Sequence, residues 1–179
     1  MEQEAALESR LPKILKGDDQ PSSDAERLTL AAMCQHKKRY AAAVRFYAEG
    51  FAARPDPFSG YRYSAAHAAA RAGCGQGVDA AQLDAAERAR LLRQALEWLR
   101  AYVTASQQYI DKQPSTDFNL QLRVTHISDW LADPEFDCVR GSEALAKLPE
   151  TERQAWQQLW NDLADKLKEA QRKAGPEKK

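Results

Sequence analysis

Three neighbouring residues of the chain, His126, Ser128 and Asp129, are of the types that form a catalytic triad. In a triad, a histidine activates a serine nucleophile and an acid orients the histidine. All three fall in one stretch with a helical pattern, so their side chains spread around the helix axis and cannot form this chain of contacts. We therefore interpret them as parts of a helix surface, and the sequence predicts no catalytic residues.

Cys34 and His36 carry a thiol and an imidazole, which are groups that bind zinc. Two further ligands would have to come from elsewhere. The chain has only three histidines and no Glu-x-x-His pair of the kind found in di-iron bundles and zinc hydrolases. We therefore expect a buried cysteine beside a turn histidine, with no metal and no cofactor, while a metal-binding bundle stays an alternative.

Two short motifs are of types that bind phosphate or nucleic acid. The run GCGQG at residues 73–77 could cradle a phosphate, but no strand precedes it and no Lys-Ser/Thr follows it. The run HKKR at residues 36–39 is basic, but nucleic-acid binding needs more basic residues on a shared face. We interpret the first as a flexible helix exit and the second as a solvated turn.

The composition narrows the classes of partner and favours a helical fold. Lysine plus arginine number 26 and aspartate plus glutamate also number 26, so no net charge attracts nucleic acid or an anionic membrane. No segment approaches the roughly 18 apolar residues of a membrane span. Hydrophobic residues make up 44% of the 179, and helix formers dominate the chain. The sequence therefore predicts an all-α protein with no nucleic-acid and no membrane partner.

Two features predict a cytoplasmic location. The N-terminus, MEQEAALESRL, is charged and has no central apolar stretch, unlike a secretory signal. The cysteines, Cys34, Cys74 and Cys138, are odd in number and lack CxxC spacing. We interpret them as small buried residues in a reducing compartment rather than as disulfide partners or zinc ligands.

Hydrophobic periodicity and helix-breaking residues divide the chain into about seven or eight helices. Capping boxes at Ser23 with Glu26, and at Asp84 with Glu87, predict two helix starts, and Pro12 predicts a kink or restart. The expected helices are one ending before Gly17, then about 24–35, 40–53, 60–72, 84–110 and 118–131, a short turn at 142–148, and a last helix from near Pro149. Phe118 belongs to the apolar pattern that marks the helix at 118–131, and the four tryptophans lie on apolar stripes and are predicted to be in the core.

Residues 24–57 have the packing pattern of a helical hairpin. Small residues at Ala31, Ala43 and Gly50 let two helix backbones approach closely. Large residues fill the space beside them, namely Leu30, Tyr40, Tyr47 and Phe51, and Pro55 follows. Ala43 is predicted to be buried at the closest approach, and Ala41 to face solvent.

This alternation of small and large residues resembles the 34-residue tetratricopeptide repeat (TPR). Residues 58–111 suit a second, degenerate repeat that a long loop interrupts. The resemblance implies hairpins that stack with capping helices, because one hairpin cannot bury its apolar face alone. We expect a single domain over residues 1–172, with capping helices at 115–172, and a disordered tail at 173–179.

The chain as a whole also resembles the helical, repeat-containing region C-terminal to the catalytic domain in some bacterial serine/threonine protein kinases. The stretches that carry this resemblance are LPKILKGDDQP, AERLTLAAMCQHKKRYAAAVRFYAEGFAA, YRYSAAHAAARAGCGQG, LDAAERARLLRQALEWLRA and LAKLPETERQAWQQLWNDL. Ser64 and His67 depart from the asparagine and cysteine that relatives more often show. The chain has no glycine-rich phosphate loop, HRD or DFG, so the resemblance implies a non-catalytic part of such an enzyme or a stand-alone relative.

In TPR arrays the first helix of each hairpin lines a concave groove. Carrying this geometry over gives the candidate groove residues Leu28, Ala32, Gln35, His36, Arg62, Ala66 and Ala69. They stand in place of the lysine and asparagine with which the family clamps acidic C-terminal peptides. Small apolar residues with one arginine suit an extended or helical peptide.

The leading hypothesis is therefore a non-catalytic scaffold that binds a protein or peptide. A small helical enzyme or metal-binding bundle is one alternative, and a structural spacer or dimerisation module is another. The sequence leaves the identity of the partner and the oligomeric state open.

Overall fold

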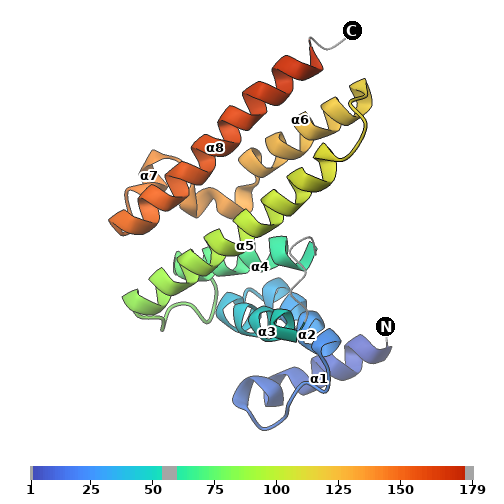
Figure 1. Ribbon diagram of the computed structural model, residues 1–179. Coiled ribbons are helices and arrows are strands. Elements are labelled where there is room, and N and C mark those ends of the chain that lie inside the picture. The colour runs from blue at the N-terminus through green and yellow to red at the C-terminus, as the bar shows by residue number, and fades with distance from the viewer. Residues whose placement is uncertain (1, 54–59, 176–179) are drawn as a thin grey trace. The chain divides into compact units, whose positions relative to one another are not determined.

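The structure is a computed structural model that describes residues 2–53 and 60–175 (Figure 1). Every regular element in these residues is a helix, which confirms the all-α prediction. In chain order they are α1 (Glu2–Lys16), α2 (Asp24–His36), α3 (Tyr40–Ala53), α4 (Gly60–Gly73), α5 (Ala85–Asp111), α6 (Asp117–Ala132), the 3₁₀ helix η1 (Pro134–Val139), α7 (Ser142–Leu145) and α8 (Glu150–Ala174). None of the helices in the described residues is long and apolar enough to cross a membrane.

The helix starts follow the predicted caps with one change. The Ser23 hydroxyl accepts from the backbone N–H of Glu26 at 3.1 Å, and the Asp84 carboxylate accepts from that of Glu87 at 2.8 Å. The Glu26 carboxylate, however, accepts from the N–H of Ser22 at 2.7 Å rather than from Ser23. The prediction that Glu26 bonds back to the N–H of Ser23 is therefore wrong, because this second bond of the capping box goes to the preceding residue.

Other boundaries depart from the sequence reading in detail. α1 continues through Pro12 without a restart. η1 follows α6 and was not expected, and Asp133 caps it by accepting from the N–H of Glu135 at 2.9 Å. α8 continues to Ala174, two residues past the expected domain end at 172. The rest of the predicted tail from residue 176, and the predicted Pro55, lie outside the described residues.

The chain divides into two compact units, with the boundary inside α5. Unit 1 comprises Met1–Leu99. Within it α2 packs on α3, α3 on α4, and α1 on α2. Its core combines the buried face of α1 with the hairpin and the alanines of α4, and its buried residues include Leu7, Leu11, Ile14, Leu30, Ala31, Ala43, Tyr47, Ala65 and Ala69.

Unit 2 comprises Arg100–Lys179, and α6 packs against α8 along its length. An aromatic cluster forms where η1 meets α8, with the ring centroids of Trp156 and Trp160 5.7 Å apart and those of Phe136 and Trp160 5.9 Å apart. The Trp160 indole N–H donates to the carbonyl of Val139 at 2.7 Å. The four tryptophans are all buried, as predicted, while Phe118, which belongs to the apolar pattern that marks α6, is 74% exposed.

Candidate binding surface

The α2–α3 hairpin has the close contact that its small residues predict. Ala31 and Ala43 are fully buried. A Cβ added to Gly50 would lie 2.9 Å from Leu28 Cδ2, closer than unbonded carbons pack, so α2 and α3 meet there because residue 50 has no side chain. Tyr47 stacks on Phe51 with 5.9 Å between ring centroids, beside this contact.

The seven candidate groove residues do not form one continuous exposed surface. Ala32 and His36 are exposed on α2, and Leu28, Gln35 and Arg62 are half-buried. Ala66 and Ala69 are completely buried, so they cannot contact a partner in this structure, and the expectation that they face an open groove is wrong. The alanine-rich pattern of α4 reflects packing on all sides rather than one apolar stripe.

The half-buried candidates already contact residues of unit 1. Leu28 packs against Gly50 in the hairpin. The Gln35 carboxamide accepts from the Tyr47 hydroxyl at 3.2 Å. The Arg62 guanidinium lies 4.5 Å from the centre of the Phe51 ring. These three side chains help to hold α2, α3 and α4 together, and the surface they leave accessible is narrower than expected.

Parts of α2 and α4 nevertheless stay accessible, and Tyr47 links them by contacting both Gln35 and Tyr61. The exposed residues are Ala32, His36 and Tyr61, the half-buried ones are Gln35 and Arg62, and we call these five residues the α2–α4 strip. Tyr61 is 44% exposed, and its ring lies 6.4 Å from that of Tyr47, which itself contacts Gln35. Burial raises the pKa of the Tyr47 hydroxyl to about 12, so this hydroxyl stays protonated and donates to Gln35 at neutral pH.

The loop after α4 is fixed against the hairpin. The Asp79 carboxylate accepts from the backbone N–H groups of Ala41 and Ala42 at 3.2 and 3.0 Å, which caps the start of α3. The N–H of Val78 donates to the carbonyl of Lys38 at 2.9 Å. A Cβ on Gly77 would lie 2.6 Å from that same carbonyl, so glycine is needed there. Residues 73–77 form the predicted exit of α4, with positive φ at Gly75 and Gly77, and they lead directly into these contacts.

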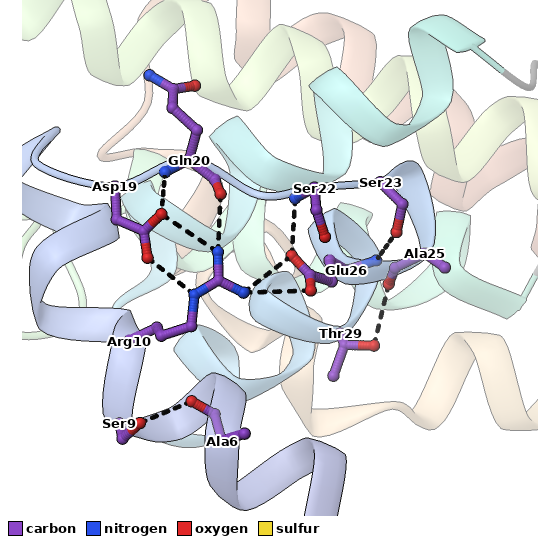
Figure 2. Close-up of polar contacts among 10 residues, drawn as sticks. All are labelled: Ala6, Ser9, Arg10, Asp19, Gln20, Ser22, Ser23, Ala25, Glu26 and Thr29. Carbon is purple, nitrogen blue, oxygen red and sulfur yellow. Dashed lines mark hydrogen bonds and ion pairs between the residues drawn. The ribbon is translucent and has the colours of Figure 1, made fainter.

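A polar network between α1 and α2 was not expected from the sequence (Figure 2). The Arg10 guanidinium donates to both carboxylate oxygens of Asp19, at 2.8 and 3.2 Å. It also donates to the Gln20 carbonyl at 2.9 Å and to Glu26 at 3.2 Å. The hydrogen bond from Arg10 lowers the pKa of Asp19. The pKa of Glu26 is lowered mainly by the hydrogen bond from the backbone N–H of Ser22. An arginine ahead of an acidic turn was the signal in the sequence that could have indicated it.

The network borders a cavity of about 460 Å³ between α1 and α2. It is lined by Ala6, Leu7, Arg10, Ser23, Ala25, Glu26 and Thr29. Its polar groups mostly bond one another: Arg10 uses donors on all three nitrogens, and Thr29 donates to the Ala25 carbonyl at 3.0 Å. Such satisfied groups stabilise the turn between the two helices and leave little free capacity to bind a ligand.

The residues considered for chemistry lie in unreactive surroundings. Burial raises the pKa of the Cys34 thiol to about 11, so the thiolate needed for nucleophilic attack or metal binding is scarce at neutral pH. His36 is exposed while Cys34 is fully buried. The His126 ring lies 6.2 Å from the Trp130 ring, and Asp129 is exposed on the same helix. In the described part of the chain, no group of three or more His, Cys, Asp or Glu side chains could hold a metal ion.

The three cysteines lie at different depths in their own units. Cys34 is a free, fully buried cysteine, as expected. Cys74 and Cys138 are half-buried, so they are less enclosed than the predicted buried packing residues.

Comparisons with known proteins identify no relative. No protein-family model matches the chain, and neither a curated protein nor a solved structure matches it. The functional argument therefore depends on the described geometry.

Proposed function

We propose that the chain is a non-catalytic scaffold of TPR type that binds a protein or peptide through the α2–α4 strip. The observation that carries the proposal is the hairpin itself, in which small residues bring α2 and α3 into contact while Ala32 and His36 stay exposed beside them. A rigid helix pair can present a fixed row of side chains to an extended or helical peptide.

The strip has the mixed character of a recognition surface. Tyr61 offers an aromatic face and Arg62 a cation held in place over Phe51. Tyrosine and arginine are enriched among residues that dominate binding energies, because both combine large contact area with polar groups. Ala32 on α2 is exposed and small, so it leaves a partner backbone room to approach that helix.

A capture experiment with three baits tests the proposal. The wild-type protein, Ala32→Arg and Ala48→Arg are immobilised and exposed to lysate of the organism that makes the protein. Ala48 is exposed on α3 outside the strip, so its variant is a matched control. We expect a specific protein retained by the wild type and by Ala48→Arg but lost on Ala32→Arg. Equal capture by all three baits, or no capture at all, would contradict the proposal.

We further propose that the scaffold is the regulatory or docking region of a bacterial serine/threonine kinase system. This part of the proposal rests only on the resemblance of the quoted sequence stretches to the repeat-containing region of such kinases. The captured protein, or the same reading frame, should then include a kinase domain. We also propose a cytoplasmic location. Disulfides persist mainly in oxidising compartments, so this location predicts reduced cysteines. Thiol labelling of the protein inside intact cells tests this, and an oxidised pair would contradict the proposed location.

One observation favours the dimerisation alternative. Phe118 is 74% exposed and Tyr109 is 57% exposed, both in unit 2. Exposed apolar side chains mark contacts between chains when they form a contiguous patch. Sedimentation of the wild type and of Phe118→Ser at several concentrations tests this. A dimer that Phe118→Ser disrupts would support it, and a monomer at all concentrations would exclude it.

A further inference from the structure

Unit 2 contains a small cavity between the C-terminal part of α5, α6 and α8. Its volume is about 190 Å³. Its apolar lining consists of Ile110, Ile127, Trp130 and Ala170, each at least 94% buried. A cavity of about 150 Å³ with such a lining holds one benzene molecule. The space therefore fits a single ring or a short branched chain.

Charged side chains surround this apolar floor and mostly neutralise one another. Arg123 pairs with Asp111 at 2.7 Å, and Lys173 pairs with Glu169 at 2.6 Å. Lys166 is the remaining cation of the lining, and it donates to the carboxamide oxygen of Gln107. The rim thus carries one positive charge that no carboxylate of the lining balances.

Two buried hydrogen-bond donors of the lining have no partner among the described residues. They are Gln107 Nε2 and Arg123 Nε. Lys166 fixes the orientation of the Gln107 amide, because its ammonium donates a hydrogen bond to the amide oxygen. The NH2 group of Gln107 therefore lies on the buried side. Burying a donor without an acceptor is unfavourable, so such groups in native proteins call for an explanation. Both atoms are donors, so the group that satisfies them is an acceptor.

We propose that this cavity binds a carboxylate carried on a compact apolar group. The carboxylate accepts from Gln107 Nε2 and Arg123 Nε and balances the charge of Lys166, while the apolar group fills the space beside Ile127 and Trp130. A phosphate suits the site less well, because a dianion exceeds the single charge of Lys166 and has no apolar group to fill the space beside Ile127 and Trp130. This site goes beyond the proposed α2–α4 strip and does not depend on it.

The carboxylate could belong to a free organic acid or to the C-terminal residue of a peptide. NMR titration of the full chain distinguishes these sources with defined probes. The small probes are phenylacetate, its neutral analogue phenylacetamide and the cation phenethylamine. The peptide probes are a tetrapeptide ending in phenylalanine with a free C-terminus and the same peptide amidated.

We expect saturable shifts of the Trp130 indole and Ile127 methyl signals with phenylacetate. Phenylacetamide should bind about tenfold more weakly, as expected for a lost charge-assisted hydrogen bond, and phenethylamine should not compete. Tighter binding of the free-acid peptide than of phenylacetate would identify a peptide C-terminus as the source of the carboxylate. Binding of phenylacetate without binding of the peptide would identify a free organic acid. No saturation with either acid, or equal binding of acid, amide and amine, would overturn the proposal.

Three variants assign the binding to the named donors. Gln107→Leu removes one donor, and Arg123→Lys keeps the charge facing Asp111 but removes Nε. Each should weaken phenylacetate binding by about tenfold. Lys168→Ala, an exposed lysine on α8 outside the lining, is the control and should bind as the wild type does. Unfolding midpoints measured on the same samples separate loss of binding from loss of fold, and unchanged affinity in both folded donor variants would overturn the assignment.

Discussion

Units 1 and 2 use opposite means to pack helices together. In unit 1 helices pack tightly at small residues: Ala43 is fully buried, and an added Cβ at Gly50 or Gly73 would lie within 3 Å of a side chain of the neighbouring helix. In unit 2 the contact of η1 with α8 is filled by Phe136, Trp156 and Trp160. Small residues let backbones approach and leave no room for added atoms, whereas a cluster of large rings depends on every ring being present.

Because of this difference, we expect opposite kinds of substitution to destabilise the two units. Unit 2 should be sensitive to truncation, because removing a large buried ring leaves a cavity. Unit 1 should be sensitive to enlargement, because an added methyl or isobutyl group has no space. The predictions below test this contrast in order of expected effect.

Trp156→Ala should be the most destabilising of these changes. Trp156 is fully buried and touches the rings of both Phe136 and Trp160. Loss of its transfer free energy together with the cavity left behind should lower the free energy of unfolding by about 3–5 kcal/mol. Urea melts followed by circular dichroism measure this. Gln157→Ala, next to it but exposed, should change the value by no more than about 0.5 kcal/mol.

Ala43→Leu should destabilise unit 1 by about 1–3 kcal/mol through overpacking. Ala43 is fully buried between the hairpin helices. Ala41 is not the exposed control that the sequence predicted, because it is half-buried and its N–H bonds Asp79. Ala48→Leu on the exposed face of α3 replaces it and should stay within about 0.5 kcal/mol of the wild type. If Ala43→Leu unfolds at the wild-type urea concentration, the packing contrast fails.

Asp79→Ala should destabilise unit 1 by about 0.5–2 kcal/mol, the usual cost of losing a helix cap. Its carboxylate caps two N–H groups of α3 from a loop far along the chain. Asp79→Asn should retain most of the stability, because the amide oxygen can still accept. Hydrogen exchange at Ala41 and Ala42 should quicken in the alanine variant, and unchanged exchange there would argue that the cap contributes nothing.

The Arg10 network should give the smallest effect, because its side chains are about one third exposed and solvent screens their charges. Both Asp19 and Glu26 have lowered pKa values in the folded state. Their contribution to stability is therefore present above their unfolded pKa values, near 4, and is lost as the pH falls through the folded ones. In Arg10→Gln, NMR titration should return the pKa of Asp19 toward its ordinary value. Glu26 should keep most of its shift, which comes first from Ser22.

The helices could be predicted from signals that act over a few residues. Much of the candidate site could not be predicted, because it depends on contacts between residues far apart in the sequence. Caps such as Ser23 and Asp84 act within three residues, so helix starts could be read from the sequence. The hairpin was also predictable, since small residues such as Ala43 recur at helical spacing. Asp79, by contrast, reaches α3 across 37 and 38 residues, and no local pattern indicates such a contact.

Burial on all sides of a helix is the second reason why the site was only partly predicted. Alanine suits both an exposed groove and a crowded interior, so the run in α4 could not distinguish the two. The structure places Ala66 and Ala69 in the interior and leaves Ala32 exposed. Phe118 shows the converse, because it belongs to the apolar pattern that correctly marked α6 and yet its ring is 74% exposed.

Hydrogen exchange of the protein with and without its captured partner tests the central proposal most directly. Binding through the α2–α4 strip should slow exchange of amides at residues 28–36 and 60–63. The exposed face of α3 around Ala48 should exchange as in the free protein. Protection confined to residues 100–174, or absent from α2 and α4, would contradict the proposal that this strip is the binding surface.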